Sequence, residues 1–306
     1  MNTTSSNVPV SAPDNVPAPA TDPVYWSVRR ELWENRSLTI APLAVTGVTL
    51  FIMLMTAFGL PRRMRTLDPA KLHAAIMNSF NIPPTLIMAT AILVGVFYSL
   101  DALYGERRDR SILFWKSLPV SDRTTVLAKA AIPLVVLPLI GFALSVASQF
   151  IVLLWSSAVL MMNGMSPAPF WAQLPLLEMP VTLIYGIGVF ALWHAPIYGW
   201  LLLISGWAKR TPVLWAFLPF LVVSVLERMA FNTQHFGSWM RWRFMGPMVA
   251  AFNVAQRPNG HFASIEHLGQ LDPLKFVRTP GLWIGLLAAA AFIAAAVRLR
   301  RFRAPM

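Results

Sequence analysis

Six long stretches without a single charged residue constrain this chain more than any other feature of its sequence. Most are long enough to cross about 30 Å of hydrocarbon at about 1.5 Å per helical residue. The chain is 56% hydrophobic and only 12% charged, against about 25% charged residues in soluble globular proteins. One compact body cannot bury so much apolar surface, so we expect an all-α membrane protein with six transmembrane helices. The stretches are residues 40–60, 83–100, 130–155, 181–207, 213–226 and 280–297.

The charge balance predicts which side of the membrane each loop occupies. The chain has 25 Lys and Arg residues against 13 Asp and Glu residues. In so apolar a chain this excess is typical of cytoplasmic loops rather than of a nucleic-acid-binding surface. Placing both termini inside puts 15 basic residues in the cytoplasm and 10 outside, of which Arg62, Arg63, Arg65 and Lys71 follow the first span. We therefore expect a multi-pass protein of a bacterial cytoplasmic (inner) membrane with both termini cytoplasmic.

The segment before the first span predicts an amphipathic helix in the membrane interface. Residues 1–22 contain four prolines and no basic residue, so we expect a disordered cytoplasmic tail rather than a signal peptide. Residues 23–37 have two faces when they are arranged as a helix. The apolar face contains Tyr25, Val28 and Leu32, and the polar face contains Ser27, Arg30 and Glu34. The six-span domain then covers residues 38–306.

The loop between the second and third spans, residues 105–123, carries the most informative pattern. It starts with alternating charges, continues with four apolar residues from Ile112 to Trp115 and stops at Pro119, which predicts a short helix. Ser121 or Asp122 can then cap the helix that enters the third span. A cytoplasmic helix with aromatic side chains between basic ones is expected to contact lipid or another protein.

Several short motifs follow one another in and after this loop. They are Glu106-Arg107, Ser111, the apolar run, Ser117-Leu118-Pro119-Val120-Ser121, and Lys129 at the mouth of the next span. Their order resembles the cytoplasmic signature of the type-2 ABC exporter permeases, although Arg110 stands where that family often has a glycine. The resemblance implies a permease that pairs with a second copy, or with a related paralogue. It also implies separate cytoplasmic ATPase subunits, which would bind the ATP and magnesium.

The resemblance further implies roles for individual segments. Residues 23–37 would form the connecting helix, and the loop helix from Arg108 to Ser117 would be the coupling helix. The extracytoplasmic loop 227–279 would form short re-entrant helices before the last span. The side chains expected to contact the ATPase are Glu106, Arg107, Arg110, Phe114, Trp115 and Lys116.

The chain's own chemistry favours an external energy source, independently of that resemblance. It contains no Gly-x-x-x-x-Gly-Lys-Ser/Thr phosphate loop, so we do not expect it to be an enzyme that hydrolyses ATP. Ion-driven carriers usually keep ionisable residues inside the bilayer, at a cost of at least about 2.5 kcal/mol each. No carboxylate lies in the middle of a span here. A separate ATPase is the remaining source, and the cargo would be amphipathic or hydrophobic.

Few polar side chains lie within the spans. Those that could line a substrate path are Gln149, Tyr185, His194 and Tyr198. The alternative is hydrogen bonding between helices, worth about 0.6 kcal/mol for each bond. Two other classes of function stay open, a membrane sensor or scaffold that signals to a cytoplasmic partner, and an intramembrane enzyme. No cofactor or metal site is expected.

Overall fold

The computed structural model describes residues 22–117, 120–172, 174–253 and 268–302, and within these ranges all regular elements are helices. Six helical segments are long and apolar enough to cross a membrane. They coincide with the six predicted spans and confirm a multi-pass, all-helical class. The predicted tail, except for Asp22, lies outside the described residues. The six segments are Ser37–Ala57, Pro69–Arg108, Asp122–Met162, Glu178–Trp207, Pro212–Phe231 and Pro280–Phe302.

The first four helices show how local sequence sets their ends. Helix α1 (Pro23–Glu34) begins where the Asp22 carboxylate accepts a hydrogen bond from the Val24 amide, with proline in the first turn. Helices α2 (Ser37–Ala57), α3 (Leu60–Thr66) and α4 (Pro69–Asp101) follow. Helix α4 begins well before the predicted residue 83, because Pro83 and Pro84 are accommodated inside it. Its 33 residues measure about 50 Å, so it is longer than the hydrocarbon is thick.

The loop after α4 contains the predicted short helix. Helices α5 (Tyr104–Arg108) and α6 (Ser111–Ser117) precede α7 (Asp122–Ala131). Ser121, rather than Asp122, caps α7, since its Oγ accepts a hydrogen bond from the Thr124 amide at 3.0 Å. A π-helical turn, η1 (Ile132–Val136), then joins α7 to α8 (Leu137–Met162). The turn contains Pro133, which cannot donate a helical hydrogen bond.

The second half of the chain is organised around α10 (Glu178–Trp207), whose most apolar stretch is 61% buried. Helix α14 (Pro280–Phe302) packs closely against α10. The contact needs Gly199, since a Cβ there would lie 3.3 Å from the Ala289 carbonyl oxygen. The remaining elements are α9 (Ala168–Trp171), α11 (Pro212–Phe231), α12 (His235–Ala251), η2 (Leu268–Gln270) and α13 (Pro273–Arg278).

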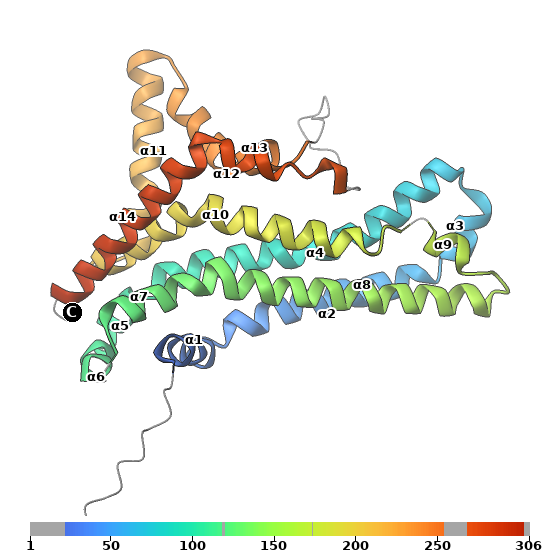
Figure 1. Cartoon of the computed structure of the whole chain (residues 1–306), viewed down its shortest axis with the longest axis horizontal. Helices are drawn as coiled ribbons and strands as arrows, with labels where there is room; N and C mark the ends of the chain where they lie inside the picture. Colours follow the sequence, from blue (N-terminus) through green and yellow to red (C-terminus); the bar gives the residue numbers. More distant parts are fainter. Residues whose placement is uncertain (1–21, 118–119, 173, 254–267, 303–306) are drawn as a thin grey trace, which may run out of the picture.

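Helices α2, α4 and α8 run alongside one another, and α10 lies along α4 (Figure 1). Helices α1, α5 and α6 and the C-terminal end of α14 gather at one end of this bundle, whereas α3 and α9 lie at the other (Figure 1). Both described ends of the chain therefore reach the same end of the molecule, as an even number of crossings requires.

Helix α11 is set across the direction of α2, α4 and α8 (Figure 1). The change of direction follows Thr211, which has a left-handed φ of 44°, and Pro212. The helix continues through Arg228 to Phe231, and only 6% of its most apolar stretch is buried. Its surface is therefore apolar and largely uncovered by the part of the chain that the structure describes, which requires lipid or another protein around it.

Candidate functional site

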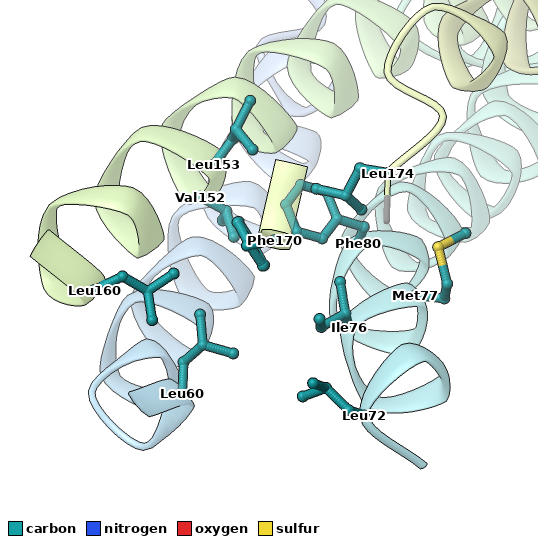
Figure 2. Close-up of a cluster of buried hydrophobic side chains, with 10 residues drawn as sticks. All are labelled: Leu60, Leu72, Ile76, Met77, Phe80, Val152, Leu153, Leu160, Phe170 and Leu174. Carbon is teal, nitrogen blue, oxygen red and sulfur yellow. The ribbon is translucent and has the colours of Figure 1, made fainter. Parts of the chain in front are cut away.

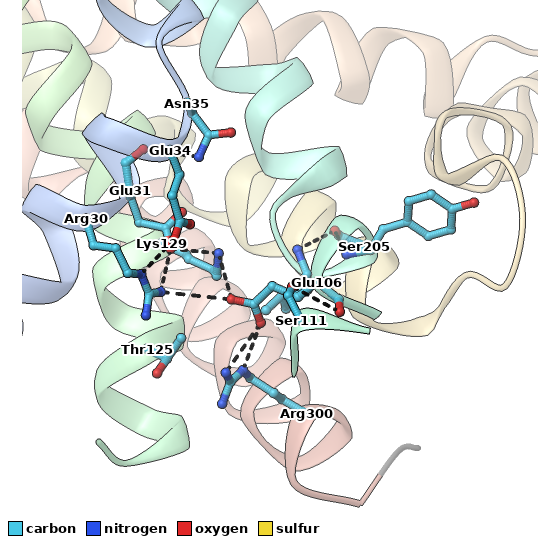
Figure 3. A network of polar contacts seen from close by, with 12 residues as sticks. Arg30, Glu31, Glu34, Asn35, Glu106, Ser111, Thr125, Lys129, Ser205 and Arg300 are labelled. Atoms are coloured by element: carbon cyan, nitrogen blue, oxygen red, sulfur yellow. Dashed lines mark hydrogen bonds and ion pairs between the residues drawn. The ribbon is translucent and has the colours of Figure 1, made fainter. Parts of the chain in front are cut away.

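Six charged side chains meet at the end of the bundle that holds α1 and the C-terminal part of α14, and Figure 3 labels all of them except Asp122. We call this group the charge cluster. Four helices contribute Arg30 and Glu31 (α1), Glu106 (α5), Asp122 and Lys129 (α7) and Arg300 (α14). Segments separated by more than a hundred positions in the sequence are thereby tied together.

Glu31 is the most deeply buried member of the charge cluster, with a side chain only 1% exposed. Its Oε1 accepts hydrogen bonds from Lys129 Nζ and from Arg30 Nη2, both at 2.8 Å, and its Oε2 accepts one from Tyr98 Oη at 2.7 Å. Burial alone would raise the pKa of Glu31, but Lys129, Arg30 and Tyr98 outweigh it and hold the pKa below its ordinary value. Glu31 is therefore a carboxylate at neutral pH.

Glu106 joins the loop between the second and third spans to the helices around it. Its Oε1 lies 3.2 Å from Lys129 Nζ, and its Oε2 lies 3.3 Å from Arg300 Nη2. Arg300 also donates to the carboxylate of Asp122 at the start of α7. One carboxylate on α5 thus contacts cations from α7 and from α14.

The charge cluster contains three carboxylates and three cations, and Glu34 adds a fourth carboxylate, whose Oε1 lies 3.7 Å from Arg30 Nε. Burying an unpaired charge is so costly that buried ions are normally paired. Removing one partner of a buried pair usually costs about 3–5 kcal/mol, because the other charge stays buried without compensation. The cluster therefore specifies one arrangement of α1, α5, α7 and α14.

A second set of polar contacts fixes α5 to the end of α10. Arg107 Nη1 donates to the carbonyl oxygens of Gly206 at 2.6 Å and Ala208 at 3.3 Å. A guanidinium is favourable there, because the last carbonyls of a helix carry partial negative charge. Ser205 Oγ accepts hydrogen bonds from the amides of Leu103, at 3.0 Å, and Tyr104, at 2.9 Å. The start of the loop is therefore held against a third transmembrane segment.

Beyond these contacts the loop presents an apolar surface. Ile112 packs inward and is 2% exposed, whereas Leu113 and Phe114 on the same helix are 58% and 60% exposed. Arg110, just before α6, is exposed and has a left-handed φ of 58°. Helix α6 thus combines an anchored side with an outward one.

Of the six side chains predicted to contact the ATPase, two are buried and two are exposed. Glu106 and Arg107 are 8% and 4% exposed, so their side chains hold the loop in place instead of facing outward. Arg110 and Phe114 face outward as expected. The side chains of Trp115 and Lys116 lie outside the described part. Contact of any of them with an ATPase stays a prediction.

Helix α1 packs against the bundle through a surface that contains polar as well as apolar side chains. Ser27 and Glu31 are buried against the protein, and Val28 and Leu32 are partly buried, whereas Tyr25 is 56% exposed. The exposed side also holds Trp26 and Trp33, and the Arg29 guanidinium lies over both rings, 5.1 and 4.5 Å from their centroids. Such an aromatic and basic surface suits the head-group region of a membrane.

The four predicted substrate-path residues are not brought together. Gln149 Nε2 donates to the Phe80 carbonyl on α4 at 3.4 Å, and Tyr185 Oη donates to the Ala251 carbonyl on α12 at 3.1 Å. Tyr198 Oη donates to the Ile92 carbonyl on α4 at 3.5 Å. His194 Nδ1 lies 3.1 Å from the Phe190 carbonyl oxygen on its own helix, α10. These contacts match the alternative of hydrogen bonding within and between helices. A shared path along these residues stays a prediction.

Sequence reasoning missed Glu31 and Arg300 as partners. No sequence pattern singled out Glu31, and Arg300 counted only as a basic residue at a membrane boundary. No local pattern could pair them with Lys129 and Glu106, because the contacts span 98 and 194 positions. Within the described ranges no group of three His, Cys, Asp or Glu side chains could hold a metal ion.

Comparison with protein-family models, with curated proteins and with solved structures finds no match to this chain. The proposals below accordingly rest on the motifs of the loop and on the geometry described above.

Proposed function

We propose that this chain is the membrane-spanning permease subunit of a type-2 ABC exporter. In this proposal it works as a dimer with a second copy or a related paralogue in a bacterial cytoplasmic membrane. Separate cytoplasmic ATPase subunits bind ATP and magnesium and dock on α5 and α6. The cargo is an amphipathic or hydrophobic molecule. The end of the bundle that holds the charge cluster faces the cytoplasm.

The observation that carries the proposal is the way the loop is anchored. A partner that pulls on a loop moves the membrane helices only if the loop is joined firmly to them. Glu106 contacts Lys129 and Arg300, while Arg107 contacts the end of α10, so α5 is joined to three transmembrane segments. These contacts are buried, where ion pairs are less screened by water and salt.

The loop also has the surface that a partner would need. Leu113 and Phe114 project from α6 next to an anchored Ile112. Aromatic and aliphatic side chains exposed among charged ones are typical of the central part of a protein interface. The loop is thus firmly attached to the bundle on one side and exposes apolar side chains on the other, which suits a segment that transmits movement between two proteins.

In this mechanism, ATP binding draws the two ATPase subunits together, and α6 moves with them. The charge cluster transmits that displacement to α1, α7 and α14 as one unit, because separating any pair would leave a buried charge uncompensated. Helix α10 follows through Arg107. Two permeases moving in this way would alternate between an inward-open and an outward-open arrangement.

Site-specific crosslinking tests the proposal. The chain contains no cysteine, so Leu113→Cys provides a single attachment point for a thiol-linked photo-crosslinker. Met162→Cys, 84% exposed at the C-terminal end of α8, is the matched control at the opposite end of the bundle. We expect Leu113→Cys in native membranes to capture a protein with a phosphate-loop motif, and Met162→Cys to capture none.

Two results would count against the proposal. Capture of a regulatory protein without an ATP-binding motif would favour the sensor or scaffold class. Absence of any captured protein, with the variant present at normal levels in the membrane, would contradict a docking role for α6.

A further inference from the structure

Two consecutive prolines, Pro83 and Pro84, lie near the middle of α4. Proline has no amide hydrogen, so the helical carbonyl four residues before it loses its partner. Pro83 frees the Ser79 carbonyl in this way, and Pro84 frees the Phe80 carbonyl. Phe80 is only 2% exposed, so solvent cannot reach its carbonyl oxygen. Because a buried carbonyl without a donor is costly, another group of the protein must pair with it.

Gln149 on α8 supplies the missing donor. Its Nε2 donates to the Phe80 carbonyl oxygen at 3.4 Å. The same arrangement occurs at a second proline. Pro247 in α12 frees the Arg243 carbonyl, and Trp193 Nε1 on α10 donates to that oxygen at 2.8 Å. In both places a side-chain N–H of a neighbouring helix replaces the amide hydrogen that proline removes.

The prolines of α4 lie between two separate hydrophobic clusters. The distal cluster, drawn in Figure 2, contains α4 residues only up to Phe80. The proximal cluster contains α4 residues only from Ala91 onward, among them Tyr98, whose Oη donates to Glu31 of the charge cluster at 2.7 Å. Each half of α4 is therefore packed into a core of its own. The buried members of the distal cluster are Leu60, Leu72, Ile76, Met77, Phe80, Val152, Leu153, Leu160, Phe170 and Leu174. Those of the proximal cluster are Leu38, Ala91, Tyr98, Ala102, Ala130, Ile132, Leu137 and Leu202.

Polar side chains of α8 lie in the layer between the two clusters. Ser145 and Gln149 are four residues apart, so they project from the same side of α8. Ser145 is 0% exposed, and in the part of the chain that the structure describes its Oγ has no hydrogen-bond partner. Hydrogen bonding is therefore incomplete where the two halves of α4 meet.

We propose that α4 bends at Pro83 and Pro84, and that Gln149 is the positioning residue that holds its two halves in the arrangement the structure shows. Residues 69–82 move as one body with the distal cluster, and residues 85–101 move as another with the proximal cluster. The proposal does not depend on the transport function proposed above. Within that function, Tyr98 would make residues 85–101 follow the charge cluster.

A double-mutant cycle on unfolding in detergent micelles tests the role of Gln149. Gln149→Met keeps the length of the side chain but removes its donor, so the Phe80 carbonyl stays buried without a partner. We expect the unfolding equilibrium constant to rise about tenfold. In the Pro84→Ala background the new amide pairs with this carbonyl, so Gln149→Met should change the constant by less than about twofold.

Pro83→Ala is the matched control background. It restores a partner to the Ser79 carbonyl only, so the rise of about tenfold caused by Gln149→Met should persist in it. No effect of Gln149→Met in the native chain, or an equal effect in all three backgrounds, would overturn the proposed role of Gln149.

Distances between pairs of spin labels test the bend. The chain has no cysteine, so Ala74→Cys with Phe97→Cys places two labels at exposed positions on either side of the prolines. Leu139→Cys with Met162→Cys spans the same number of positions along α8, with no proline between them, and is the control pair. With Gln149→Met added, we expect the distance distribution of the α4 pair to broaden and that of the α8 pair to stay unchanged.

Two outcomes would contradict the bend. One is an α4 distribution that is as narrow with Gln149→Met as without it. The other is an equal broadening of both pairs, which would show a general loosening of the protein rather than movement at the prolines.

Discussion

Lys129 on α7 and Glu31 on α1 form an ion pair across 98 positions of the sequence, with 2.8 Å between Nζ and Oε1. Their side chains are 3% and 1% exposed. The pair joins the N-terminal helix to the start of the third span, and Glu106 extends it to the loop and to α14. The position of α1 is thus set by a buried polar contact as well as by its apolar side chains.

The first prediction concerns the stability of this pair. Lys129→Met should lower the free energy of unfolding by about 3–5 kcal/mol, because Glu31 and Glu106 both lose a buried partner. Lys209→Met removes an exposed lysine near the same end and should change it by less than about 0.5 kcal/mol. Denaturant unfolding in detergent micelles measures both. Equal effects would contradict the burial of Lys129.

The second prediction follows from the low pKa of Glu31. A carboxylate whose pKa is lowered by folding stabilises the folded protein above its ordinary value of 4.5, and this contribution is lost as the pH falls below that value. The difference in unfolding midpoint between the native chain and Glu31→Gln should therefore be large at pH 7 and shrink toward pH 3.5. Glu34, on the same helix, is 43% exposed and lies 3.7 Å from Arg30 Nε, and burial raises its pKa, so the difference between the native chain and Glu34→Gln should change with pH in the opposite direction. A difference for Glu31→Gln that does not change with pH would refute this assignment.

The third prediction concerns the contact between α12, α10 and α14. Arg243 donates to the carbonyl oxygens of Gly281, at 3.0 Å, and Trp193. A Cβ at Gly285 would lie 2.8 Å from the Arg243 Cζ, so Gly285→Ala should displace the guanidinium and cost about 1–3 kcal/mol. Gly188→Ala meets no atom within 4 Å and should instead stabilise α10 by about 0.5–1 kcal/mol. Thermal unfolding would show opposite shifts, and a stabilising Gly285→Ala would be inconsistent with the Arg243 contacts.

The fourth prediction concerns sidedness. A membrane-impermeant maleimide applied to intact cells should leave Leu113→Cys unlabelled and react with it after the cells are opened. Met162→Cys should already react in intact cells, because it lies at the end of α8, at the opposite end of the bundle. Labelling of Leu113→Cys in intact cells would place α6 outside and exclude docking of a cytoplasmic ATPase.

The six spans could be predicted because their signal is local. Charge-free apolar runs such as residues 181–207 need no knowledge of the rest of the chain. The cap of α7 could be narrowed to Ser121 or Asp122, and the structure assigns it to Ser121. The early start of α4 could not be seen in the same way. The stretch before Pro83 contains polar residues such as Lys71, His73 and Asn78 and leads into two consecutive prolines, and α4 packs against α2 and α8.

The charge cluster could not be predicted, because each member has an ordinary local explanation. Arg300 lies in a basic stretch typical of a cytoplasmic flank, and Glu106 belongs to a charged loop. Their pairing depends on how α5 and α14 approach each other in space, which no spacing in the sequence encodes. The orientation of α1 against the bundle could not be predicted for the same reason, since it includes the buried ion pair between Glu31 and Lys129.

Hydrolysis of ATP by the protein purified from its own membranes tests the central claim most directly. The tagged chain, reconstituted in liposomes, should carry a bound ATPase that hydrolyses Mg-ATP. Phe114→Ala combined with Trp115→Ala should insert at normal levels but lose the ATPase or its coupling to transport. A chain that carries no ATPase, or a double variant with unchanged partner binding and coupling, would contradict the account.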